Sequence, residues 1–226
     1  MATREGAYGA AQPLFEESLL HTRALGDRRF AARALNNLGE VARAQGDFTG
    51  AIALYHESLR LTRELGERSG TAVLLGNLGM CALAQGDPGR AATCLGESLL
   101  LCSELGEKRG VAACLLGLAR VSAVERRPER AAVLFGAAEA LVQAIDAHLD
   151  PVDLVEYDRT IIALRAAMGS VAFSAAWSKG RALLPLPQAV AYAAAGTGAE
   201  SPSSSRSGVL SQRGAPREPL SRKLSA

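Results

Sequence analysis

Residues Ala51–Gly66 read AIALYHESLRLTRELG, and this pattern returns once later and once earlier in the chain. The later copy is AATCLGESLLLCSELG at 91–106, and the earlier copy is AQPLFEESLLHTRALG at 11–26. A fixed period of about 40 residues, with apolar residues at helical spacing throughout, is the signature of stacked helix pairs. The sequence therefore predicts an all-α solenoid, an architecture that favours binding of a partner over catalysis.

Three full repeats follow one another at 25–64, 65–104 and 105–144, and the first two are identical at 19 of 40 positions. Glycine followed by an acidic residue marks evenly spaced turns at Gly26, Gly46, Gly66, Gly86 and Gly106. Glycine readily adopts the left-handed backbone conformation of the residue that follows a helix. An acidic side chain is favourable at the N-terminus of the next helix. The repeat weakens where the next turn reads Arg126-Arg127-Pro128.

The N-terminal end of the predicted array is incomplete. Residues 1–7 form a short polar remnant, and the repeat region runs over 8–147. Its first helix, Tyr8–Arg23, aligns with the second helix of a pair, so we expect the chain to be truncated before it. An array that begins in the middle of a repeat leaves an apolar face uncovered. We expect that face to make the chain self-associate.

The repeat period stops after Ala144. Three further helices are predicted at Val152–Met168, Ser170–Leu183 and Gln188–Ala195. They make up a C-terminal helical cap over 148–195. Residues 196–226 are rich in Gly, Ser and Pro and have no apolar period, which predicts a disordered tail.

Composition excludes several classes of function. The net charge is +2, and the tail carries five basic against two acidic residues, so the body is close to neutral. A near-neutral body has no basic footprint, and we expect no direct nucleic-acid binding by this chain. No apolar run is long enough for a membrane span and no signal peptide is visible, which predicts a cytoplasmic protein. The cysteines are expected to be free and buried: Cys81, Cys94, Cys102 and Cys114.

The repeats resemble the tetratricopeptide repeat. The resemblance rests on Leu38, Gly39 and Ala42, followed by Ala51 and Tyr55, a pattern that returns in the next two repeats. Alanine or serine replaces the usual tyrosine after Leu-Gly. The period is also longer than that of the usual tetratricopeptide repeat, which is about 34 residues, and this implies longer helices.

The C-terminal part is similar to the repeat region of large ATP-binding LuxR-type bacterial transcriptional regulators. The segments that carry this similarity are RAAVLFGAAEAL at 130–141, EYDR at 156–159, AAWSKGRAL at 175–183 and QAVAYA at 188–193. The resemblance covers about residues 5–195. It implies an ATPase before the repeats and a helix-turn-helix after the linker. Neither a phosphate-binding loop nor a helix-turn-helix is present in this sequence.

No catalytic residues, metal site or cofactor are predicted. His56 and Glu57 begin a pattern close to that of zinc proteases, but Arg60 stands where the second histidine is needed. No Ser or Cys has a His and an acid beside it in sequence that would activate it as a nucleophile. The chain is therefore not expected to be an enzyme.

Partner contacts are expected on the first helix of each pair, because these helices line the concave face in this class of repeat. The predicted contact residues are Arg33, Asn36, Asn37, Glu40, Arg43, Asn77, Met80 and Arg120. These residues would line a groove on the concave face that is polar in the first repeat and apolar in the later repeats. Such a groove would bind a protein or peptide, such as an amphipathic helix with a charged end, or a small effector. The alternative is that the two asparagines Asn37 and Asn77 only hydrogen-bond nearby backbone and that the arginines are solvated.

Two functions remain open from sequence. The first is the sensing segment of a LuxR-type regulator, in which a bound effector or partner biases the packing of the attached domains. The second is a free-standing adaptor with no transcriptional role.

Overall fold

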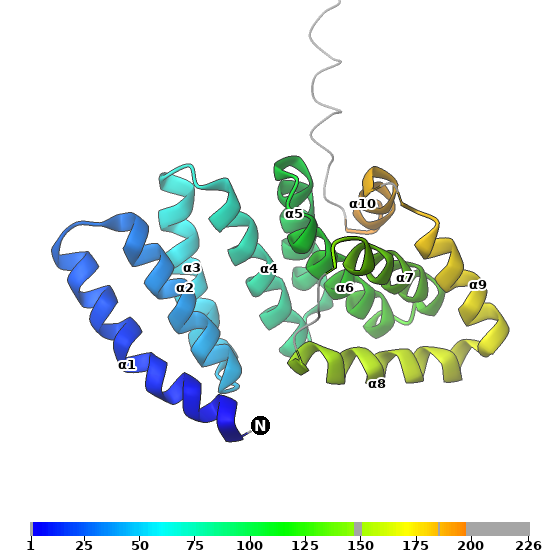
Figure 1. Cartoon of the computed structure of the whole chain (residues 1–226), viewed down its shortest axis with the longest axis horizontal. Helices are drawn as coiled ribbons and strands as arrows, with labels where there is room; N and C mark the ends of the chain where they lie inside the picture. The colour runs from blue at the N-terminus through cyan, green and yellow to red at the C-terminus, as the bar shows by residue number, and fades with distance from the viewer. Residues whose placement is uncertain (1, 147–150, 185, 198–226) are drawn as a thin grey trace, which may run out of the picture.

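The computed structural model describes residues 2–146, 151–184 and 186–197. Over these residues the chain is a succession of packed helices and contains no strand (Figure 1). The repeat helices are α2 (Arg28–Ala44), α3 (Phe48–Glu64), α4 (Arg68–Ala84), α5 (Pro88–Leu105), α6 (Lys108–Val124) and α7 (Pro128–Ala144). The flanking helices are α1 (Ala2–Ala24), α8 (Pro151–Met168), α9 (Ser170–Arg181) and α10 (Leu186–Ala194). The predicted all-α helix-pair solenoid is confirmed.

The helix starts repeat with the sequence. Helices α2, α4 and α6 begin at Arg28, Arg68 and Lys108, each one repeat period after the last. The turns between helices use glycines with positive φ, such as 83° at Gly46. At the turn before α7, Arg126 takes the same left-handed conformation with φ 58°. The fold therefore keeps the turn even where the sequence has lost its glycine.

The acids after these glycines act in two ways. The side chains of Asp27, Asp47 and Asp87 accept a hydrogen bond from the backbone N–H three residues later, as an N-cap does. Glu67 and Glu107 make no such cap bond. Instead they reach back to the preceding repeat, where Glu67 pairs with Arg29 and Glu107 accepts a hydrogen bond from Ser69 Oγ at 2.6 Å.

Small residues set the spacing within each pair. A Cβ on Gly39 would lie 2.5 Å from the buried ring of Tyr55, and a Cβ on Gly79 would lie 2.6 Å from Leu95 Cγ. The buried hydroxyl of Ser58 donates to Ala32 O at 2.7 Å, and that of Ser98 donates to Ala72 O at the same distance. The Leu-Gly and Ser positions of the repeat therefore allow close packing and fix the register between helices.

Helix α1 is longer than the sequence predicted. It begins at Ala2, whereas the repeat alignment started it at Tyr8 and assigned 1–7 to a polar remnant. The alignment placed Glu5-Gly6-Ala7 opposite Gln45-Gly46-Asp47. Ala7 has no side-chain acceptor for an N-cap, whereas Asp47 does, so nothing at that point starts a new helix.

The last three helices pack at the C-terminal end of the stack. Helix α9 lies along α7, and α8 contacts α6, α7 and α9. Helix α10 turns back onto α5, α6 and α7 (Figure 1). Helix α9 ends two residues earlier than predicted and α10 begins two residues earlier. The predicted tail lies outside the described residues, apart from Gly196 and Thr197.

Two glycines permit the contact between α7 and α9. A Cβ on Gly136 would lie 2.3 Å from Trp177 O, and a Cβ on Gly180 would lie 2.0 Å from Val133 O. Backbone therefore meets backbone at this crossing. The indole N–H of Trp177 donates to Glu139 Oε2 at 3.0 Å beside it.

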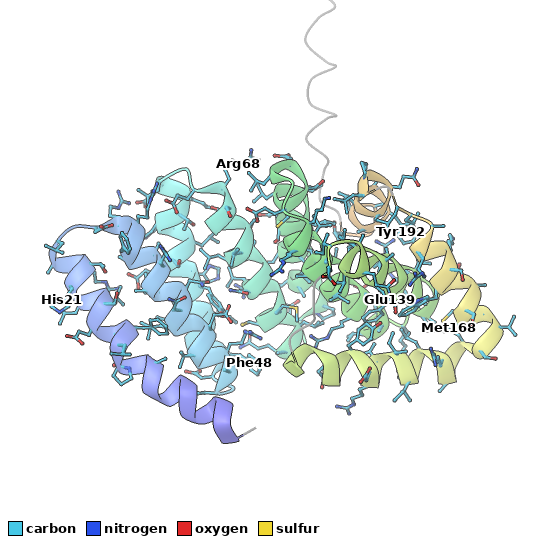
Figure 2. All side chains as sticks on the ribbon, viewed as in Figure 1. His21, Phe48, Arg68, Glu139, Met168 and Tyr192 are labelled. Carbon is cyan, nitrogen blue, oxygen red and sulfur yellow. The ribbon has the colours of Figure 1, made fainter. Side chains whose placement is uncertain are left out.

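A set of polar contacts also joins α10 to α7. The Arg130 guanidinium donates to Tyr192 O at 3.1 Å and Ala193 O at 2.8 Å, and lies 5.0 Å from the centroid of the Tyr192 ring. Figure 2 shows Tyr192 on α10. A cation at the last carbonyls of a helix is favourable. Arg130 thus holds the C-terminal end of α10 against α7.

Candidate functional site

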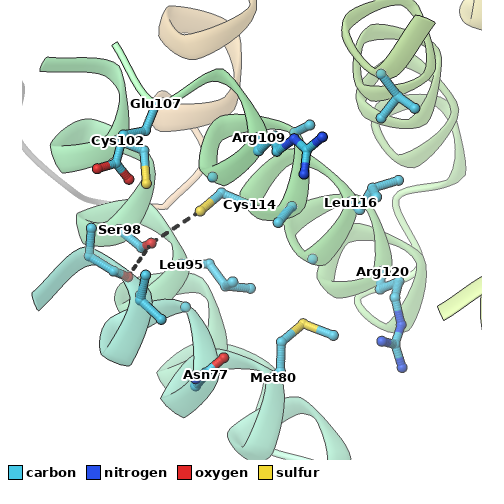
Figure 3. Close-up of a pocket in the computed structure, with 18 of the residues that line it drawn as sticks. Asn77, Met80, Leu95, Ser98, Cys102, Glu107, Arg109, Cys114, Leu116 and Arg120 are labelled. Carbon is cyan, nitrogen blue, oxygen red and sulfur yellow. Dashed lines mark hydrogen bonds between the residues drawn. The ribbon is translucent and has the colours of Figure 1, made fainter. Parts of the chain in front are cut away.

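A large pocket, hereafter the central pocket, opens between α4 and α6. Its volume is about 510 Å³. Helix α4 contributes Val73 and Met80, helix α6 contributes Leu116, and helix α5 forms the floor through Leu95 (Figure 3). Tyr157 of α8 closes one side. The pocket thus joins the repeats to the first helix that lies outside the repeat period.

The walls of the central pocket are apolar and partly exposed. Val73 is 48 % exposed, although it is a large apolar side chain in a region of close packing. Met80 and Leu116 are half-buried. Exposed apolar surface in a concavity of this size is typical of a ligand or peptide site.

The charged residues of the central pocket are mostly basic. Three arginines line it, Arg43, Arg109 and Arg120, against the single acid Glu107. Arg120 pairs with Glu156 of α8 at 3.8 Å, and Ser69 holds Glu107. Arg109 is exposed, and no hydrogen bond or ion pair joins it to another described residue. Its charge is therefore available to a bound carboxylate.

A polar network links α2 to α4 beside this pocket. Asn77 Nδ2 donates to Glu40 Oε1 at 2.7 Å and to Asn36 Oδ1 at 3.2 Å, and Arg43 donates to Glu40 Oε2 at 2.9 Å. Burial lowers the Arg43 pKa, but the Glu40 carboxylate and Tyr55 together raise it by more, so the net shift is upward. The network leaves Arg43 Nε and Tyr55 Oη without a hydrogen-bond partner.

The predicted contact residues fall into three groups. Arg43, Asn77, Met80 and Arg120 line the central pocket. Asn36 and Glu40 belong to the network with Asn77, so this asparagine bonds side chains of the preceding repeat and not nearby backbone. Arg33 is exposed and lies 5.6 Å from the centroid of the Phe30 ring, and Asn37 is half-buried outside the pocket lining. Their contact with a partner remains a prediction.

Sequence reasoning did not place Arg109 or Tyr157 at the central pocket. Arg109 lies one helical turn before Ala113 on the face that also carries Leu116 and Arg120, so the helical period could have found it. Tyr157 comes from outside the repeats and had no such signal. Burial, followed by the nearby Glu139 carboxylate, raises the pKa of Tyr157 to about 12.

A histidine-based site, a metal site and a membrane span have little support in the described part of the chain. His56 contacts Arg90 through a ring nitrogen at 2.8 Å, and burial, followed by Arg90, lowers its pKa. No cluster of three or more His, Cys, Asp or Glu side chains there could hold a metal ion. Among the described helices, none has the length and apolar character needed to cross a membrane.

Comparison with known families finds a match to the first part of the chain. The tetratricopeptide repeat model matches residues 1–64 and again 30–99. The matched part, residues 1–99, is similar to the tetratricopeptide repeat. It takes in α1–α4, including the α4 wall of the central pocket, and most of α5. No curated protein matches the chain.

The whole chain is also similar in fold to a solved structure, the crystal structure of BtubC (BKLC) from P. vanneervenii. The TM-score is 0.60 at 22 % sequence identity, and the match covers 99 % of this chain and 83 % of the other. The similarity thus extends the solenoid fold to the helices beyond the tetratricopeptide-repeat match.

Proposed function

We propose that the central pocket binds an apolar segment of a protein partner that also carries a carboxylate. The tetratricopeptide-repeat region indicates a protein–protein interaction scaffold. The observation that carries the proposal is the pocket itself, in which exposed apolar walls adjoin a basic rim. Such a combination favours an amphipathic helix or an extended peptide.

The apolar contacts supply affinity in this proposal. Val73, Met80 and Leu116 are the side chains whose exposed surface a partner would cover. Arg109 supplies a charge-assisted hydrogen bond to a carboxylate, because no described residue already neutralises it. Arg120 is a weaker candidate, since Glu156 competes for it.

We further propose that this scaffold is the sensing segment of a LuxR-type, ATP-dependent transcriptional regulator in the cytoplasm. The proposal rests on the resemblance of 130–141, 156–159, 175–183 and 188–193 to that family. The four free cysteines suit a reducing compartment. In this role, occupation of the central pocket would bias the packing of α8 through Tyr157 and Arg120, and with it the attached domains. A free-standing adaptor is the second candidate.

Selection from a displayed peptide library tests the pocket. The purified chain should enrich peptides in which an acidic residue flanks apolar residues. The variant Val73→Arg should lose these peptides, because the new side chain fills the pocket and adds positive charge beside the apolar wall. The matched control is Val124→Arg, since Val124 is 58 % exposed on α6 and does not line the pocket. Equal enrichment by both variants would refute binding at this site.

Sequencing of the DNA on both sides of the gene separates the two contexts. An upstream phosphate-loop ATPase and a downstream helix-turn-helix in the same reading frame would support the regulator. An independent start and stop with neither domain would support the adaptor.

A further inference from the structure

Helix α1 presents a face that is covered by another helix elsewhere in the array. On α3 this face carries Tyr55 and Ser58, which are 0 % and 1 % exposed beneath α2. The residues 40 positions earlier, on α1, are Phe15 and Ser18. Phe15 is half-buried and Ser18 is exposed, and Leu14 beside them is 65 % exposed. Figure 1 shows α1 at the end of the stack, with α2 on one side and no described helix on the other.

The first contact that a covering helix makes on this face is polar. Ser58 Oγ on α3 donates to Ala32 O of α2 at 2.7 Å, and the aligned Ser98 Oγ on α5 donates to Ala72 O of α4 at the same distance. Ser18 on α1 makes no hydrogen bond with another described residue. Its hydroxyl is therefore free to bond a main-chain carbonyl of a helix that docks here.

The second contact is steric, and it restricts the sequence of the covering helix. Gly39 of α2 faces the Tyr55 ring, and a Cβ at this glycine would lie 2.5 Å from it. Gly79 of α4 faces Leu95 in the same way, with a Cβ 2.6 Å from Leu95 Cγ. A helix that packs on Phe15 as α2 packs on Tyr55 therefore needs glycine opposite the ring.

The charge of this part of α1 is complementary to that of α2. Over 11–22, α1 carries Glu16 and Glu17 and no lysine or arginine. Glu16 accepts a hydrogen bond from the neutral amide of Gln12, and Glu17 lies 3.6 Å from His21, so no described lysine or arginine pairs with either acid. Helix α2 carries four arginines against one glutamate. Opposite charge favours a basic helix as the occupant of this face.

We propose that this face of α1 docks a basic helix of the tetratricopeptide first-helix type, supplied by another molecule. The docked helix takes the place on α1 that α2 takes on α3, with glycine against the Phe15 ring and a backbone carbonyl at Ser18. Helix α2 of a second copy cannot be this occupant, because it is packed between α1 and α3 of its own chain. The face lies outside the lining of the central pocket, so its test does not depend on the proposed function.

The probe is a fluorescent synthetic peptide with the sequence of 27–45, which comprises α2 and both of its cap residues. Its anisotropy should rise to saturation as the purified full-length chain is added. A peptide with Gly39→Leu should bind about tenfold more weakly or worse, because its side chain overpacks the contact with the ring. Leucine favours a helix more than glycine does, so weaker binding would not come from a weaker helix. Equal binding by the two peptides, or no binding by either, would overturn the proposal.

Two variants of the full-length chain locate the site. Ser18→Arg should weaken binding of the original peptide about tenfold, because the long side chain occupies the place of the docked backbone. Leu20→Arg is the matched control, since Leu20 is 69 % exposed and aligns with Arg60, which α3 tolerates beneath α2. This control should bind the peptide as the original chain does. An equal loss in both variants would assign the effect to the added charge and contradict the proposal.

Light scattering separates this occupant from a second copy of the chain. With excess peptide, the mass should be that of one chain and one peptide at every concentration, because the peptide and a second copy would need the same face. A dimer that persists in excess peptide would show that the copies cover α1 themselves, and it would overturn the proposal.

Discussion

The contact between α7 and α9 makes a sharp prediction for Gly136→Ala. Within a helix, alanine is more favourable than glycine by about 1 kcal/mol, so helix propensity alone predicts that this variant is more stable. In this structure the new Cβ would lie 2.3 Å from Trp177 O, which is backbone and has no rotamer to change. Helix α9 must therefore move away from α7, or the contact must be lost.

The magnitude follows from these two opposing effects. Overpacking a close contact costs about 1–3 kcal/mol, and a contact with main chain belongs at the upper end of that range. After the gain in propensity of about 1 kcal/mol, the net loss of stability should be about 2 kcal/mol. The loss should be local, because a solenoid helix depends chiefly on its neighbours.

The fluorescence of Trp177, the only tryptophan in the chain, reports on this contact during urea unfolding. Gly136→Ala should lower the midpoint of the fluorescence transition and affect the circular dichroism transition less. Gly76→Ala in α4 is the matched control, because its Cβ would meet nothing closer than Ser98 Oγ at 3.4 Å. It should keep or raise the midpoint. A Gly136→Ala variant whose fluorescence midpoint equals or exceeds that of the original chain would refute the argument.

Four further outcomes are expected. Arg126→Gly should raise the free energy of unfolding by about 1 kcal/mol, because φ is 58° at this arginine; a thermal melt with an unchanged or lower midpoint would count against it. Ser58→Ala should cost about 1 kcal/mol in urea unfolding, since it removes the buried bond to Ala32 O, and an unaltered midpoint would show that this bond contributes nothing. Burial raises the pKa of Tyr157 in the folded chain to about 12, above the value of about 10 for a free tyrosine. The protonated phenol therefore stabilises the fold fully below pH of about 10, and this stabilisation is lost as pH rises through about 12. In thermal melts between pH of about 10 and about 12, the melting temperature of Tyr157→Phe should fall less with pH than that of the original chain. An equal fall in both would show that Tyr157 ionisation is not its cause. Finally, α1 exposes Leu14 and Leu20, so light scattering should show mass rising with concentration, and a constant monomer mass would exclude self-association through this helix.

The sequence by itself determined the repeat architecture. Its regular period predicted helix pairs in repeats at 25–64, 65–104 and 105–144, and its glycines predicted the turns between helices. The helices α2, α4 and α6 indeed begin directly after such turns, at Arg28, Arg68 and Lys108. This succeeds because each repeat helix packs on its neighbours in the same way, so local patterns carry the information. The predicted start of α1 was wrong. It relied on the alignment of residues 5–7 with a repeat turn, but this segment lacks the N-cap residue that starts a helix at the other turns.

Tertiary structure alone decided how the non-repeating helices complete the site. The pattern predicted α8, α9 and α10 as helices, but not that α9 lies along α7 or that α8 brings Tyr157 to the central pocket. The close approach of Cys102 to the α6 backbone at Gly110 was equally invisible, because it depends on how α5 packs against α6. These features arise from contacts between residues that share no period, and such contacts are defined only when the chain has packed.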